Sequence, residues 1–373
     1  MVRLKVDHVS KIFTDRPGET QVALDDVNFE VRNGEFVSLL GPSGCGKTTL
    51  LTMMGGFQDC TDGAILLDGV AINGPSPERG YVFQNYALFP WMTVEKNVAY
   101  ALKFMDLPEE EKKARVENAL EMAHLTEHRK KFPIQLSGGM QQRCAVARAL
   151  VSRPKVLLLD EPLAALDLRL RKDMQNELKR IQQAMGITFI YVTHDQEEAL
   201  SMSDTVVVMD KGRIQQIGKP EDIYNEPKNA FVADFIGESN ILDGIMLSDF
   251  KVKFFGRTFN CVDKGFEPNE PVDVVIRPED IDIVEPGQSQ LTGTVTSVTF
   301  KGLNYDIIVD FKGFKWLIQT TDFHDVGKTI GIRLNPEDIH IMHKSEYSGM
   351  FGDYSSYSAE YDELTEDAGD EEE

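Results

Sequence analysis

Long apolar runs and an excess of positive charge are both missing from this 373-residue sequence. No stretch of about 18 consecutive apolar residues occurs, so the sequence predicts no helix that crosses a bilayer. Residues 1–7 also lack the apolar run of a secretory signal. We therefore expect a chain that does not cross a membrane by itself.

Acidic residues outnumber basic ones by 61 to 39, which gives a formal net charge of −22. This balance argues against a nucleic-acid-binding protein, which needs basic surface to displace counterions. It argues equally against adhesion to anionic lipid. The acidity is uneven, because residues 346–373 contain eleven Asp or Glu and no Lys or Arg. Such a tail cannot bury a core, and we expect it to be disordered.

Cysteine is scarce, and none of the four cysteines belongs to a CxxC pair. The sequence therefore predicts neither a disulfide framework nor a zinc site, and favours reduced thiols in a cytosolic protein. Apolar residues make up 42% of the chain, which is ample for at least one full core. The cysteines are Cys45, Cys60, Cys144 and Cys261.

Residues 1–237 alternate short apolar runs with longer helical patterns. Continuous apolar strands separated by helices predict a parallel sheet that is covered on both faces. Within this α/β region, residues from about 90 to 150 look mostly helical and are expected to form a helical subdomain. The apolar runs lie at residues 36–40, 156–160, 188–193 and 206–209.

Residues 238–345 have a different texture, with short alternating strands and glycine turns that predict a small all-β, barrel-like domain. A weak repeat occurs in it, because Ile276–Ile283 resembles Leu334–Ile341. Two interpretations remain open. The copies are either two similar strand-entry turns or the two halves of a small barrel.

The strongest chemical motif is Gly-Pro-Ser-Gly-Cys-Gly-Lys-Thr, which matches the phosphate-binding P-loop between a predicted strand and a predicted helix. Its glycines let backbone N–H groups wrap a triphosphate, and the helix start adds positive potential. Lys47 is expected on the β- and γ-phosphates of ATP, and the Thr48 hydroxyl on Mg²⁺. The residues expected at the nucleotide are Gly41, Pro42, Ser43, Gly44, Cys45, Gly46, Lys47, Thr48 and Thr49.

A second motif, Asp160-Glu161-Pro162, follows four apolar residues. This places Asp160 at the carboxyl end of a core strand, where α/β sheets bind ligands. Asp160 is expected to hold Mg²⁺ through water. Because neighbouring side chains on a strand point to opposite faces, Glu161 is left to polarise the attacking water.

A third motif, Leu-Ser-Gly-Gly, precedes a helical pattern. Ser137 is a good helix N-cap, and Gly138 and Gly139 leave backbone N–H groups accessible at the helix start. The sequence thus predicts a second anion site in the same domain.

The order of these motifs, with Gln84 after the first and His194 after the last, resembles the ATP-binding-cassette (ABC) ATPases, the motor subunits of membrane transporters. The resemblance covers residues 1 to about 235. It implies an α/β P-loop NTPase cassette with a helical subdomain. It also implies a head-to-tail homodimer, in which each ATP lies between one P-loop and the partner's Ser137–Gly139.

The same resemblance assigns roles to four further residues. It implies that Phe13 stacks on adenine and that Gln84 senses Mg²⁺ and the attacking water. It implies that Asp167 ends a loop that crosses to the partner's site, and that His194 contacts the γ-phosphate and links it to Glu161. The chain departs from the family pattern at two places: Ala164 stands where Ser is commoner, and Met140 where many members have Gln.

The family resemblance also implies partners. Phe89 and Trp91 belong to the segment on which two transmembrane permease subunits dock, so the chain is expected at the cytoplasmic face of the cell membrane. An extracytoplasmic solute-binding protein takes part indirectly, and no nucleic acid is expected. The all-β region resembles the OB-like TOBE domain of importer ATPases, and its texture is most similar to that of polyamine (spermidine and putrescine) importers.

Other solutes stay open, namely sulfonate or nitrate, iron(III), thiamine and sugars, because the motor subunit does not hold the solute. Pro77–Gly80 and Leu88–Trp91 resemble nitrate and sulfonate importers. A non-transport ABC ATPase of DNA repair or ribosomes is a distant alternative, as is a regulatory subunit without hydrolysis. The acidic tail is either a solvated extension or a polyamine-sensing segment.

Overall fold

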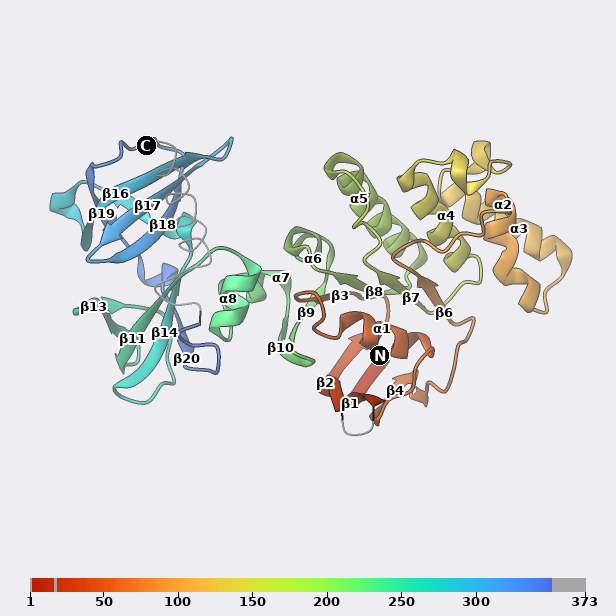
Figure 1. The fold of residues 1–373 in the computed structure, drawn as a ribbon, viewed down its shortest axis with the longest axis horizontal. Coiled ribbons are helices and arrows are strands. Elements are labelled where there is room, and N and C mark those ends of the chain that lie inside the picture. Colours follow the sequence, from red (N-terminus) through yellow and green to blue (C-terminus); the bar gives the residue numbers. More distant parts are fainter. Residues whose placement is uncertain (1, 17–18, 351–373) are drawn as a thin grey trace. The chain divides into compact units, whose positions relative to one another are not determined.

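The computed structural model describes residues 2–16 and 19–350 (Figure 1). The chain divides into two compact units, Met1–Pro220 and Glu221–Glu373. Each unit is described by itself below. Among the described residues, no helix combines the length and the apolar character needed to span a membrane.

A six-stranded sheet forms the centre of the first unit, in the order β10-β9-β3-β8-β7-β6. Strands β9, β3, β8, β7 and β6 run parallel, and β10 joins β9 antiparallel. The predicted parallel sheet is therefore present. Its strands are β3 (Phe36–Leu40), β6 (Arg79–Val82), β7 (Val156–Asp160), β8 (Thr188–Thr193), β9 (Thr205–Asp210) and β10 (Arg213–Gly218).

Alternate residues of these strands belong to two separate hydrophobic cores. Val37 and Leu158 pack in one cluster with α1, and Phe36 and Leu157 pack in another with helices α4 and α5. Both faces of the sheet are thus covered, which explains why the strands read as continuous apolar runs. The helices are α1 (Lys47–Gly55), α4 (Gly138–Leu150), α5 (Leu168–Met185) and α6 (Gln196–Met202).

A second, four-stranded antiparallel sheet has the order β2-β1-β4-β5. Its apolar side packs in the same cluster as α1, so α1 has a sheet on either side (Figure 1). The glycine-rich loop before α1 is therefore held between two sheets. The strands are β1 (Val2–Arg16), β2 (Glu19–Arg32), β4 (Asp62–Leu67) and β5 (Val70–Ala71).

The segment between β6 and β7 is mainly helical and has its own core, built around Val98, Leu120 and Cys144. Helix α4 contributes to this core and to the core under the sheet, and so connects the two. The elements are α2 (Val94–Ala99), η1 (Tyr100–Phe104), α3 (Glu109–Met122), η2 (Thr126–His128), η3 (Pro133–Gln135) and α4.

The second unit contains two five-stranded antiparallel sheets, β13-β12-β11-β14-β20 and β15-β19-β16-β17-β18. The buried Asn240 joins them, because its amide donates to Leu317 O (2.9 Å) and accepts from Leu317 N (2.8 Å). The strands are β11 (Asn240–Ser248), β12 (Lys251–Phe254), β13 (Arg257–Asn260), β14 (Glu270–Ile276), β15 (Asp282–Val284), β16 (Leu291–Phe300), β17 (Tyr305–Phe311), β18 (Phe314–Thr320), β19 (Thr329–Arg333) and β20 (His340–His343).

The sequence repeat marks the two places where the chain changes sheet. Each copy forms one short 3-10 turn, η4 (Pro278–Asp280) or η6 (Pro336–Asp338). The first turn leads from β14 to β15 and the second from β19 to β20, in opposite directions between the sheets. The pairing is reciprocal, since β14 pairs with β20 and β15 with β19. Both copies are therefore strand-entry turns, and the strands that flank one copy pair with the strands that flank the other.

Two short helices, α7 (Pro220–Asn225) and α8 (Ala230–Ile236), precede β11. The division between the two units falls before most of α7, whereas the sequence suggests a domain boundary near residue 237. That boundary stays a prediction. The acidic tail is expected to be disordered from residue 346, but residues 346–350 are described, and Tyr347 is buried with its ring 5.3 Å from that of Phe231. The rest of the predicted tail, residues 351–373, lies outside the described residues.

Candidate nucleotide site

The P-loop connects the buried strand β3 to α1 through two glycines in the left-handed region, Gly44 (φ 81°) and Gly46 (φ 109°). A Cβ built on Gly46 would lie 2.6 Å from Ala23 O, so the loop backbone is pressed against β2. A Cβ on Gly44 would meet no heavy atom within 4 Å. Gly44 therefore presents bare backbone to open space, as expected of a loop that wraps an anion.

Lys47 is the first residue of α1 and is only 4% exposed. Its Nζ donates to Gly41 O (2.7 Å) and Pro42 O (2.8 Å) and lies 3.7 Å from Cys45 Sγ. The ammonium thus folds back over its own loop. Burial raises the pKa of the Cys45 thiol, so this cysteine is held as the neutral thiol beside Lys47.

Thr48 and Asp160 meet at the carboxyl edge of the sheet. The Thr48 hydroxyl donates to Asp160 Oδ1 at 3.0 Å, and the Tyr81 hydroxyl lies 3.4 Å from Asp160 Oδ2. Burial raises the pKa of Asp160, the bond from Thr48 opposes that shift, and the nearby Glu161 charge adds to it. A hydroxyl and a carboxylate side by side are oxygen ligands suited to Mg²⁺. Tyr81 was not predicted from the sequence.

Glu161 follows β7 with a left-handed backbone (φ 42°), an uncommon conformation for a residue with a side chain. Its amide donates to Val192 O at 3.1 Å, and this bond attaches the turn after β7 to strand β8. Gln84 Nε2 donates to Glu161 Oε2 at 3.1 Å, and His194 Nδ1 lies 3.4 Å from Glu161 Oε1. Three residues predicted as catalytic are therefore in one cluster.

A cavity of about 630 Å³ brings together half of the residues predicted at the nucleotide, and Gly41, Pro42 and Cys45 of the P-loop are not among its lining residues. Phe13 of β1 lines the cavity together with residues of the P-loop, and Gln84 and Glu161 line it as well. Sequence reasoning missed the residues from β2 and from the β9–β10 turn. The lining residues are Phe13, Gln21, Val22, Ala23, Ser43, Gly44, Gly46, Lys47, Thr48, Thr49, Gln84, Glu161, Lys211 and Gly212.

Ser137, Gly138 and Gly139 do not line this cavity. Ser137 instead caps α4, accepting from Met140 N at 3.4 Å. The two glycines pack on the region around α5, because a Cβ on Gly138 would lie 3.4 Å from Leu166 and one on Gly139 3.0 Å from Leu170. The second predicted anion site is therefore separate from the P-loop cavity within one chain.

Asp167 also lies apart from the cavity, and its carboxylate caps α5 by accepting from Leu170 N at 3.0 Å. The sequence did not reveal the arginine that ties this loop to the loop of His194. Arg171 donates to Leu166 O (3.3 Å) and to Asp195 Oδ2 (2.8 Å). The loops that precede Asp167 and follow His194 are thus linked by one guanidinium.

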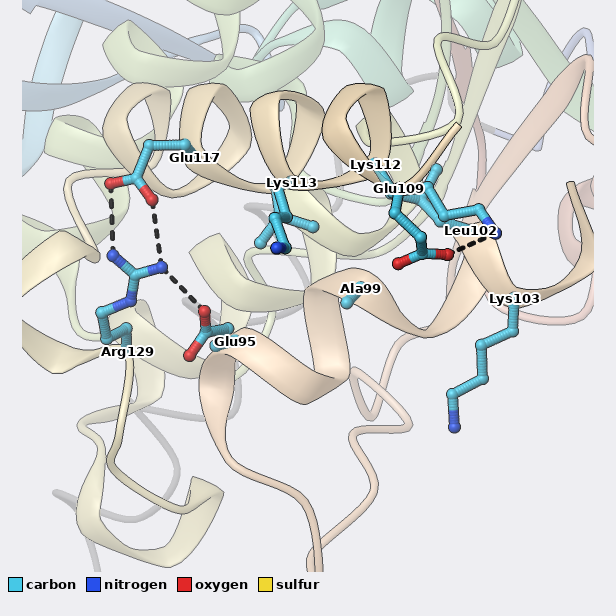
Figure 2. Close-up of a pocket in the computed structure, with 10 residues that line it drawn as sticks. Glu95, Ala99, Leu102, Lys103, Glu109, Lys112, Lys113, Glu117 and Arg129 are labelled. Atoms are coloured by element: carbon cyan, nitrogen blue, oxygen red, sulfur yellow. Dashed lines mark hydrogen bonds and ion pairs between the residues drawn. The ribbon is translucent and has the colours of Figure 1, made fainter. Parts of the chain in front are cut away.

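Two of the further hollows in the described part of the first unit bear on the site and its surroundings. One, of about 580 Å³, is an aromatic groove whose walls include Phe57, Tyr81, Phe83, Phe89 and Phe104. The other lies between α2, η1 and α3 and has a charged rim (Figure 2).

The charges around this second hollow are largely paired. Arg129 contacts Glu95 at 2.7 Å and Glu117 at 3.0 Å, and Lys112 contacts Glu109 at 3.2 Å (Figure 2). None of the predicted site residues lines the hollow. We therefore give it no part in nucleotide binding.

Comparison with known proteins relates both units to established families. Residues 24–164 match the family model of ABC transporters, and residues 274–342 match that of the TOBE domain. The chain is 54% identical to the spermidine/putrescine import ATP-binding protein PotA of Clostridium novyi, over 91% of this chain and 98% of that protein. It is 57% identical to the protein of the same name from Desulfitobacterium hafniense, over 86% and 93% of the two chains.

Solved structures agree with these matches. A dimeric ATP-binding cassette in a post-hydrolysis state, bound to ADP and Pi, is 33% identical, with a TM-score of 0.52 over 58% of this chain and 98% of that one. The predicted fold class, a P-loop cassette followed by an all-β TOBE domain, is confirmed. The chain therefore belongs to the ABC transporter family, among its ATP-binding-cassette ATPases that carry a TOBE domain.

Proposed function

We propose that this chain hydrolyses ATP to drive the import of polyamines, spermidine and putrescine, through an ABC transporter. One observation supports the hydrolytic part above all: Gln84 and Glu161 line the same cavity as the P-loop. Support for the solute comes from the relatives, which are named spermidine/putrescine import proteins. Polyamines therefore rank above sulfonate, nitrate, iron(III), thiamine and sugars.

The nucleotide fits the cavity on chemical grounds. The open face of Gly44 leaves room for phosphate oxygens beside the backbone, and α1 begins at Lys47 without a side-chain cap on Gly46. Its first N–H groups are thus available to an anion. Lys47 exchanges its bonds to the loop carbonyls for the β- and γ-phosphates. Phe13 offers a flat apolar ring to the adenine.

Thr48 and Asp160 fit a magnesium ion, since their oxygens lie 3.0 Å apart at the mouth of the phosphate loop. Magnesium bound to phosphates needs few protein ligands, and Gln84 would supply an amide oxygen. When bound, Mg²⁺ neutralises negative charge that builds up on the phosphates during transfer. Asp160 stays ionised at such a site, because a cation favours the carboxylate over the acid.

Glu161 and His194 carry the remaining chemistry. Phosphoryl transfer depends mainly on positioning and charge neutralisation. Glu161 orients the attacking water and accepts its proton, and Gln84 holds the second carboxylate oxygen in place. His194, beside Glu161 Oε1, contacts the γ-phosphate and links it to the base.

A second copy of the chain completes each site. Ser137–Gly139 and Asp167 lie outside the P-loop cavity of their own chain, yet the turn offers backbone N–H groups at the start of α4. In a head-to-tail homodimer this turn meets the partner's γ-phosphate, and Asp167 lies beside it. With Ala164 in the usual Ser position, one hydroxyl contact across the dimer is missing.

The aromatic groove is the docking surface for the two permease subunits. Phe104 is 74% exposed, and Trp91, whose ring packs 5.7 Å from that of Phe89, is 70% exposed. Exposed aromatic rings gathered around a groove are typical of a protein–protein contact. Docking there places the chain at the cytoplasmic face of the membrane, and the solute-binding protein acts only through the permeases.

The purified full chain provides the test. We expect Mg²⁺-dependent ATP hydrolysis that is lost in Lys47→Met. Lys253→Met, which changes an exposed lysine of β12, serves as the control. Hydrolysis that survives in Lys47→Met at the wild-type rate would overturn the assignment of this cavity.

A further inference from the structure

The loop from β6 to α2 runs past both the nucleotide cavity and the aromatic groove. Gln84 lies at its start, next to Glu161, and Phe89 lies on the groove. Between them, Tyr86 (φ 61°) and Ala87 (φ 44°) both have left-handed backbone. Two successive residues with side chains rarely adopt this conformation, so surrounding contacts must hold it.

The amides of Tyr86 and Ala87 donate to Phe83 O (2.8 Å) and Asn85 O (2.7 Å), and Arg148 of α4 supplies the contacts from outside the loop. Its Nη2 donates to Tyr86 O at 2.8 Å and its Nη1 donates to Ala87 O at 2.6 Å. The planar guanidinium matches two neighbouring carbonyls, which a single ammonium cannot do. Burial lowers the pKa of the Arg148 guanidinium, so the two carbonyls hold a partly buried charge.

The same side chain reaches the groove. The Arg148 guanidinium lies 5.6 Å from the centre of the Phe89 ring and forms part of the groove wall with Phe83 and Ala87. Its backbone belongs to α4, the helix that begins with the Ser137–Gly139 turn. One arginine therefore contacts the Gln84 loop and the groove, and it is anchored in the helix that carries the second anion site.

We propose that Arg148 is a positioning residue that fastens the Gln84 loop to α4, so that the docking groove and the nucleotide site change position together. The proposal rests on the function proposed above. Since Gln84 is two residues from Tyr86, a shift of the clamped carbonyls against α4 moves the amide that holds Glu161. A permease segment in the groove presses on the same clamp from the other side.

Trp91 is a built-in reporter of this loop. It is exposed and packs on Phe89, whereas the only other tryptophan, Trp316, is fully buried in the second unit. A Trp91→Phe variant defines the share of emission that comes from the loop. The response to a slowly hydrolysed ATP analogue with Mg²⁺ then measures how far nucleotide binding moves it.

The experiment compares the full-length wild type with Arg148→Gln and Arg148→Lys, and nucleotide affinity is measured separately by calorimetry. We expect a saturable change of Trp91 emission in the wild type and the loss of most of it in Arg148→Gln, with affinity within about threefold of wild type. Arg148→Lys keeps the positive charge but cannot donate to both carbonyls at once, so its change of Trp91 emission should lie between those of the wild type and Arg148→Gln. Arg115→Gln, which removes an arginine that bonds to Glu111 and Ser152, should keep the full response.

Two results would overturn the proposal. One is a folded Arg148→Gln or Arg148→Lys protein with the full Trp91 response, which reduces Arg148 to a merely structural role. The other is a wild type that binds the analogue without any change at Trp91. A wild type that binds no nucleotide would instead refute the proposed function, and calorimetry alone reveals that case.

Discussion

Gln84 Nε2 donates to Glu161 Oε2 across 3.1 Å, although 77 positions separate the two residues in the chain. Glu161 follows the interior strand β7 of the sheet, and Gln84 begins the loop that leads to the helical segment. The bond joins the part of the chain that would activate water to the part that reaches the docking groove. Hydrolysis and transport can therefore be coupled over a short path.

Glu161→Gln is expected to slow ATP hydrolysis by about 10²–10³-fold, because an amide cannot accept the proton of the attacking water. ATP binding should survive, so the variant should accumulate as an ATP-bound dimer. Phosphate release and analytical ultracentrifugation with MgATP measure both effects. Glu177→Gln, a change in α5 away from the cavity, serves as control. A wild-type rate in Glu161→Gln would exclude Glu161 as the base.

Gly46 and Gly44 should respond differently to alanine. Both have left-handed backbone, which costs alanine about 1–2 kcal/mol. At Gly46 the added Cβ would also lie 2.6 Å from Ala23 O, and overpacking adds roughly 1–3 kcal/mol. Thermal unfolding should give the order wild type, Gly44→Ala, Gly46→Ala from most to least stable. The reverse order of the two variants would contradict this account of the loop.

Glu198 should give the first unit a pH-dependent stability. Its carboxylate is buried and accepts from Tyr191 OH (2.7 Å) and Thr193 Oγ1 (2.7 Å). Burial raises its pKa above the ordinary 4.5, and Asp195 adds to the shift while Arg171 opposes it. The unfolded chain therefore loses this proton first, and the contribution to stability falls as the pH rises through and above 4.5.

Glu198→Gln removes that titration. The melting temperature of Glu198→Gln minus that of the wild type should be higher at about pH 8 than at about pH 5. Glu197→Gln, at the neighbouring and exposed position, is the matched control. A melting temperature of Glu198→Gln that is higher relative to the wild type at about pH 5 than at about pH 8 would show that the sign is wrong.

Phe104→Ser tests the docking groove. Loss of an exposed aromatic anchor at an interface typically costs about 2 kcal/mol, so association with the permease subunits should weaken by roughly 30-fold. Co-purification with the permeases and solute uptake should both fall more than ATP hydrolysis by the isolated chain does. Phe250→Ser removes a phenylalanine that is 50% exposed in the second unit and should leave co-purification intact. Equal losses in both variants would argue against the groove.

Much of the first unit could be predicted because its signals are local. The apolar runs at residues 36–40 and 156–160 became β3 and β7, and the glycine motif between strand and helix became the P-loop. Asp160 and Glu161 were expected at a strand end for the same reason. The resemblance to the ABC family, based on the order of these motifs, agrees with the comparisons.

Other parts of the site depend on contacts that no local pattern records. Tyr81 reaches Asp160, and Arg171 links the loops of Leu166 and Asp195, only because distant segments meet in the fold. Lys211 lines the cavity from a turn that looks ordinary in the sequence. Arg148 did leave one signal, since it is a lone cation within the apolar run from Cys144 to Leu150.

Polyamine uptake tests the central claim most directly. Cells that lack this protein are supplied with the wild type or with Glu161→Gln, and entry of labelled spermidine and putrescine is measured. We predict that uptake is lost without the protein and is restored by the wild type alone. Unchanged polyamine uptake in cells without the protein would contradict the account and direct attention to sulfonate, iron(III), thiamine or sugar as the solute.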